Sequence, residues 1–152
     1  MNHNIQTYRP HPRLAPFIET YYVFQTGRLS EESVVEKAFP DGSATIIFSL
    51  DSEVYVPNRD FLMMPANPLL VGTMTHCHDD EFSAGVTLFG INFQPGGFSS
   101  FFDFPLHEVV NEVIEFNDFL CPASEAPGSQ LAAMVDKFLL GRLSIPDPVL
   151  SL

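Results

Sequence analysis

Residues 39–50 read FPDGSATIIFSL, a tight-turn sequence that runs directly into an apolar segment. Pro40 fixes φ for the second position of a turn, Asp41 can bond to backbone amides ahead of it, and Gly42 tolerates positive φ. In the segment that follows, residues 44, 46, 48 and 50 form one apolar face, and residues 45, 47 and 49 form a semi-polar one. This alternation predicts a β-strand in the wall of a barrel.

Short strands are predicted on both sides of this stretch, separated by turn-forming residues. They cover residues 19–26, 33–39, 54–56, 59–64, 69–74 and 82–93. Turn signals that recur every eight to twelve residues or so are typical of an all-β barrel or sandwich. We expect residues 1–11 to be frayed because they are polar, and residues 12–18 to form a short helical turn.

Two amphipathic helices are predicted after the strands. Apolar residues recur with helical spacing from Pro105 to Leu120 and again from Ser129 to Leu143. Residues 121–128 contain two prolines and a glycine and are expected to link the two helices. Four phenylalanines at positions 98, 101, 102 and 104 precede the first helix and are expected to pack in the core.

The order of these motifs resembles a known family. The motifs are PRLAPFI at residues 12–18, the tyrosine pair at 21–22, the PDG turn at 40–42, VG at 71–72, GINFQPGG at 90–97 and the closing helix at 131–143. Over most of the chain they resemble the N-terminal regulatory domain of AraC-type bacterial transcription factors. The resemblance implies a cupin-like barrel that senses a small molecule or mediates dimerisation. It also implies a helix-turn-helix DNA-binding region, which this sequence lacks.

We therefore predict a mainly-β fold with C-terminal helices, namely a cupin-like (double-stranded β-helix) barrel plus a two-helix hairpin. Residues 1–152 are expected to form a single regulatory domain. The barrel occupies about residues 12–97, the helical part about residues 98–143, and residues 144–152 begin a linker to the missing helix-turn-helix domain.

The function predicted from these features is that of an effector-sensing and dimerisation domain of an AraC-type regulator, with no catalytic activity and no cofactor. A net charge of −12 argues against DNA binding by this segment, because phosphates would be repelled. We expect a homodimer that binds a small-molecule effector and meets DNA only through the absent domain. The residues predicted to line the ligand site are Tyr22, Phe24, Phe48 and Asn92, and those predicted for dimerisation or interdomain contact are Leu131, Met134, Val135, Phe138 and Leu139.

One cluster has the residue types of a metal site, and it supports an alternative function. His76, His78 and Glu81 resemble a compressed first metal-binding motif of cupins. Two histidines and a carboxylate can hold a transition metal. However, the second motif fails, because Ser100 stands where a third histidine would follow the turn at residues 95–97. The alternatives are a small metal-dependent cupin enzyme that uses these three residues, and a barrel without a ligand that only pairs subunits.

The cellular compartment is predicted from the cysteines and from the lack of targeting features. Cys77 and Cys121 have no CxxC spacing, and the chain opens without a signal-peptide pattern. No apolar run approaches the roughly 20 residues that span a bilayer. We therefore expect a cytoplasmic protein that does not enter a membrane.

Overall fold

The computed structural model describes residues 3–26, 34–38, 42–50, 54–56, 61–63, 67–76, 78–82, 87–119 and 128–143. The elements in this part of the chain are β1 (His3–Tyr8), β2 (Ile18–Thr26), β3 (Val34–Ala38), β4 (Thr45–Ser49), β5 (Val54–Val56), β6 (Phe61–Met63), β7 (Leu69–Val71), β8 (His78–Phe82), β9 (Thr87–Phe93), the 3-10 helices η2 (Phe98–Ser100) and η3 (Leu106–Val109), β10 (Val113–Glu115) and α1 (Gly128–Arg142). The predicted turn residues Pro40 and Asp41, both cysteines, the linker at 121–127 and residues 144–152 lie outside it.

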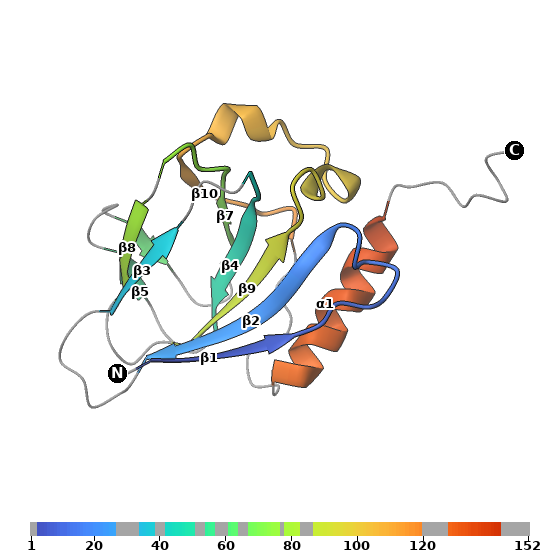
Figure 1. Cartoon of the computed structure of the whole chain (residues 1–152), viewed down its shortest axis with the longest axis horizontal. Coiled ribbons are helices and arrows are strands. Elements are labelled where there is room, and N and C mark those ends of the chain that lie inside the picture. The colour runs from blue at the N-terminus through green and yellow to red at the C-terminus, as the bar shows by residue number, and fades with distance from the viewer. Residues whose placement is uncertain are drawn as a thin grey trace, which may run out of the picture.

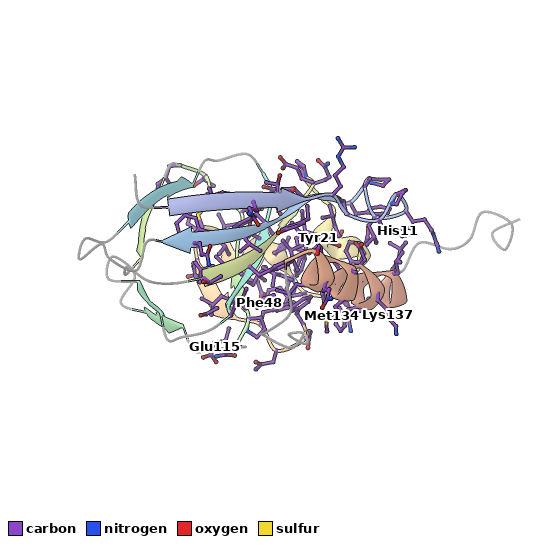
Figure 2. All side chains as sticks on the ribbon, turned by 90° about the horizontal axis from the view of Figure 1, so that it is seen from below. His11, Tyr21, Phe48, Glu115, Met134 and Lys137 are labelled. Carbon is purple, nitrogen blue, oxygen red and sulfur yellow. The ribbon has the colours of Figure 1, made fainter. Side chains whose placement is uncertain are left out.

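Six strands form one sheet in the order β1-β2-β9-β4-β7-β10, and every neighbouring pair is antiparallel. The other four strands form two antiparallel pairs, β3 with β8 and β5 with β6. Figures 1 and 2 place these two small sheets at the opposite end of the molecule from α1. The mainly-β class is therefore confirmed.

Strand β4, which falls within the apolar segment at residues 44–50, lies inside the sheet between β9 and β7. Ala44, Ile46 and Phe48 are buried in the main core, whereas Ile47 belongs to a second cluster. Successive side chains of a strand point to opposite faces, so the two clusters lie on the two faces of the sheet. Gly42, just before β4, has a φ of +78°, the left-handed conformation expected of a turn glycine. The predicted strand and its apolar face are confirmed.

The main core is rich in phenylalanine and lies on the sheet face that α1 covers. Phe93 packs edge-on against Phe98 with ring centroids 5.4 Å apart, and Phe102 packs edge-on against Phe116 at 5.0 Å. Phe98, Phe101 and Phe102 are all buried. Such aromatic pairs stabilise a core beyond the area that they bury. The predicted packing role of this phenylalanine cluster is confirmed.

The first strand was not predicted. Residues 1–11 were expected to be frayed, but β1 pairs with β2 along its whole length, from His3 opposite Thr26 to Tyr8 opposite Tyr21. Pairing of this kind depends on backbone hydrogen bonds, which a polar sequence provides as well as an apolar one. The hydrophobic pattern of residues 1–11 therefore does not predict a strand there.

The first predicted helix is wrong. Between Pro105 and Leu120 the chain forms the short η3, a turn and then β10, which pairs with β7. Asn111 adopts φ +62°, and its backbone N–H donates to the Thr73 carbonyl at 2.9 Å. A left-handed residue ends a helix, and the β-branched Val113 and Ile114 suit a strand. The pairing of β10 with β7 therefore outweighs the helical spacing of its apolar residues. Among the described residues, α1 is the one α-helix.

Helix α1 confirms the second predicted helix. Leu131, Ala132, Val135 and Leu139 are buried, and all four belong to the main core. The helix therefore closes one face of the six-stranded sheet. Within the described residues, no helix combines the length and the apolar character required to cross a bilayer.

Candidate functional site

The face of the six-stranded sheet that points away from α1 has a mixed polar and apolar surface, and we call it the second face. Strand register sets its composition: Tyr22 lies opposite Gly90, and Asn92 lies opposite Thr45. Its buried cluster and the partly buried side chains beside it are Phe24, Ile47, Leu69, Leu88, Tyr22, Val71 and Val113. Three of the four residues predicted to line a ligand site, Tyr22, Phe24 and Asn92, therefore lie together on this face.

Asn92 is the most informative polar residue of the second face. Its Oδ1 accepts a hydrogen bond from the Thr45 hydroxyl at 2.9 Å, and both side chains are partly buried. Within the described residues, no acceptor meets the two N–H groups of the Asn92 side-chain amide. A partly buried amide with open donors can bind a carbonyl, hydroxyl or carboxylate oxygen of a small molecule.

Gly90 allows the Tyr22 ring to lie flat across the second face. A Cβ atom at Gly90 would overlap the ring carbons and the hydroxyl of Tyr22. Glycine within a strand often marks the close approach of another group, and here that group is an aromatic side chain of the neighbouring strand. The glycine thus positions Tyr22 diagonally next to Asn92.

The fourth predicted ligand residue, Phe48, lies on the opposite face. Its ring stacks on Phe89 with centroids 5.3 Å apart and packs against Phe119 at 5.8 Å. Its side chain is buried in the main core, which α1 covers. Phe48 is therefore separated by the sheet from Tyr22 and Asn92.

The five residues predicted for dimerisation differ widely in exposure. Leu131, Val135 and Leu139 are buried in the main core of their own chain, and Phe138 packs against it. Met134 is 41% exposed and lies on the side of α1 that is turned away from the strands (Figure 2). Dimerisation stays a prediction, and only Met134 of the five offers an exposed side chain for it.

Asp136 joins α1 to the strands by two hydrogen bonds. The Tyr21 hydroxyl donates to Asp136 Oδ1 at 2.7 Å, and the His11 backbone N–H donates to the same oxygen at 3.0 Å. Figure 2 shows Tyr21 between the sheet and the helix. Burial, the hydrogen bond to Asp136 and the charge of Asp136 together raise the pKa of Tyr21 far above its usual value. Tyr21 is therefore held in its neutral, donating form.

The C-terminal end of α1 has a separate anchor. Arg142 Nε donates to the carbonyl oxygen of Phe101 at 3.0 Å, and its guanidinium lies 4.7 Å from the centre of the Phe102 ring. A cation near the last turn also complements the helix dipole. Polar contacts thus fix α1 at its middle, through Asp136, and at its C-terminal end, through Arg142.

The histidine cluster does not form one continuous strand. His76 is exposed and lies in a bend before β8, with its Nδ1 3.2 Å from the Thr75 hydroxyl. His78 opens β8 and Glu81 lies within it, and their side chains fall outside the described part of the chain. Among the described residues, no group of three or more His, Cys, Asp or Glu side chains could hold a metal ion. The predicted metal site is therefore untested as a whole.

Two polar pairs in the structure were not predicted from the sequence. Thr45 partners Asn92 across 47 positions, and Asp136 partners Tyr21 across 115. For Thr45, the one indication in the sequence was the semi-polar strand face predicted for residues 45, 47 and 49. The sequence around Asp136 does not indicate that Tyr21 is its partner, because this contact depends on how α1 packs against the sheet.

The described residues thus define a small, mainly-β domain whose sheet has one filled face and one mixed face. A family model described as "Domain of unknown function (DUF6597)" matches residues 6–115. The match covers more than half of the chain, and the chain belongs to this family. It runs from within β1 to the last residue of β10 and ends before α1. No curated protein and no solved structure matches the chain.

Gly90→Ala is expected to lower the free energy of unfolding by roughly 1–3 kcal/mol, because the new methyl group must displace the Tyr22 ring. In a Tyr22→Ala background the same change should cost much less. Gly141→Ala is the matched control, since a Cβ there meets no atom within 4 Å. Urea denaturation measures all four variants. An equal cost in both backgrounds would show that Tyr22 is not the obstacle.

The raised pKa of Tyr21 predicts a loss of stability at high pH. An unfolded tyrosine ionises near pH 10, whereas folded Tyr21 keeps its proton. The contribution of Tyr21 is therefore fully present below about pH 10 and is lost as the pH rises beyond it. Stability measured from pH 8 to 11 should fall more steeply for the wild type than for Tyr21→Phe. Equal slopes would contradict this assignment.

Proposed function

We propose that the chain is the effector-sensing and dimerisation domain of an AraC-type transcription regulator, with a cupin-like barrel that closes around the second face. In this proposal the domain neither catalyses a reaction nor binds DNA itself. DNA binding belongs to a helix-turn-helix domain elsewhere in the regulator. The order of motifs along the chain and its mainly-β fold support the proposal.

The observation that carries the sensing role is the Asn92 side-chain amide, which lies beside the Tyr22 ring and whose N–H groups meet no acceptor in the described part of the chain. A functionless sheet face would be expected to be apolar and covered, or polar and solvated. Here two polar side chains, Thr45 and Asn92, share the face with an apolar cluster and are only partly buried. A small molecule with an aromatic or apolar body and an oxygen acceptor fits this chemistry.

The mechanism that we propose passes through β2. Tyr22 points to the second face, and its neighbour Tyr21 points to α1, where it donates to Asp136. A ligand that shifts the backbone of β2 therefore changes the geometry of the contact with the helix. To act as an effector, the ligand must bind more tightly to one helix arrangement than to the other. The helix position then sets the spacing of the DNA-binding halves.

A thermal-unfolding screen tests the sensing role. The panel contains small molecules with an aromatic or apolar body and an oxygen acceptor. A ligand at about 100 times its dissociation constant adds about 2.7 kcal/mol, which raises Tm by roughly 5–10 °C for a domain of this size. Asn92→Leu should reduce the shift strongly, because it removes the N–H donors.

Met134→Ala is the control for the screen, because Met134 lies on the outer side of α1. It should respond to the ligand as the wild type does. A hit that stabilises Asn92→Leu as much as the wild type would place the ligand elsewhere. A panel without any hit would count against the sensing role.

A further inference from the structure

Strand β1 forms one border of the six-stranded sheet. Its six residues pair with β2 on one side, and among the described residues no strand pairs with the other side. Figure 1 shows β1 running along the outer margin of the sheet, with α1 near its C-terminal end only. At that end Tyr8 lies against Gly128 of the helix. Residues 5–7 are exposed.

This border lacks the features that normally prevent an edge strand from pairing with another chain. Such features are prolines, charged side chains, bulges and short length. Residues 3–8 read HNIQTY, with no proline and no Asp, Glu, Lys or Arg, and they pair with β2 without a shift in register. Ile5 is also 48% exposed, more than any other large apolar residue among those described.

The opposite border of the sheet is protected. β10 has three residues, of which Glu115 is exposed, and Glu112 lies just before it. Left-handed Asn111 turns the chain immediately upstream. Because one border carries protective features and the other does not, β1 is the border suited to pairing.

We propose that β1 pairs with β1 of a second copy of this chain, antiparallel about a twofold axis, so that the two six-stranded sheets become one continuous sheet. This pairing would form the dimer surface of the proposed regulator. Only its biological role rests on the proposed function. A chain with a net charge of −12 repels its own copy, and the uncharged β1 border minimises that repulsion. In this arrangement the backbone N–H and C=O groups on the outer side of the strand pair with the same groups of the second copy, whatever the side chains are.

The twofold axis also selects a register. Hydrogen-bonded and non-hydrogen-bonded residue pairs alternate in an antiparallel ladder, so the axis must lie midway between one residue and the same residue of the second copy. Centring it on Ile5 places Ile5 against Ile5 of the second copy and covers the exposed side chain. The flanking pairs are then Asn4 with Gln6 and His3 with Thr7, all uncharged. Centring it on Gln6 would leave Ile5 opposite Thr7.

Light scattering after size exclusion tests the proposal on the whole chain, from about 1 to about 200 µM, because small interfaces have dissociation constants in this range. The wild type should approach twice its monomer mass of 16.9 kDa. Ile5→Lys should remain at the monomer mass, and Ile5→Val should behave as the wild type. Met134→Lys, at the exposed site on α1, should still dimerise. Near-UV circular dichroism checks that each variant is folded.

Two light-scattering results would overturn the proposal: a wild type that stays monomeric over the whole range, or an Ile5→Lys dimer as strong as that of the wild type. Amide hydrogen exchange gives a second measurement that needs no variant. Protection of residues 4–7 should rise with protein concentration, and unchanged protection would also overturn the proposal. The ligand screen on monomeric Ile5→Lys keeps the two proposals separate, because sensing can succeed or fail there independently of pairing.

Discussion

The carboxylate of Asp136 holds α1 against the sheet, and much of the structure depends on this contact. One oxygen accepts from the Tyr21 hydroxyl on β2 and from the His11 backbone just after β1. The apolar side of the helix supplies most of the burial, but such packing has little direction. The hydrogen bonds fix which turn of the helix faces which strand. Tyr21 is buried and stays neutral, so its hydroxyl donates to this carboxylate.

The alternation of β2 gives this contact its functional interest. Tyr21 faces the filled side of the sheet and Tyr22 faces the mixed side. The two environments are thus joined by a single peptide bond. Gly90 leaves room for the Tyr22 ring close to the sheet, and the side-chain N–H groups of Asn92 beside it meet no acceptor among the described residues. In the proposed regulator, this is the shortest route from an occupied second face to the helix.

Much of the fold could be predicted from the sequence, but not the parts that depend on distant pairing. The β4 strand and the α1 helix follow from local turn chemistry and from two clear hydrophobic periods. The β10 region was predicted to be helical because its apolar residues have helical spacing. In the fold it forms a strand because it pairs with β7. In the candidate site, Tyr22 and Asn92 could be singled out as aromatic and polar residues in strands. Thr45 and Asp136 could not be assigned their partners, since those contacts depend on register and docking.

The role of Asp136 is tested by amide hydrogen exchange, measured by mass spectrometry on the wild type and on Asp136→Ala, since alanine preserves the helical propensity of α1. We expect faster exchange along α1 and in the central part of β2, with β7 and β10 unchanged, because only the junction between helix and sheet is weakened. Unchanged exchange in α1 would contradict a role of Asp136 in holding the helix, since packing alone would then keep it in place.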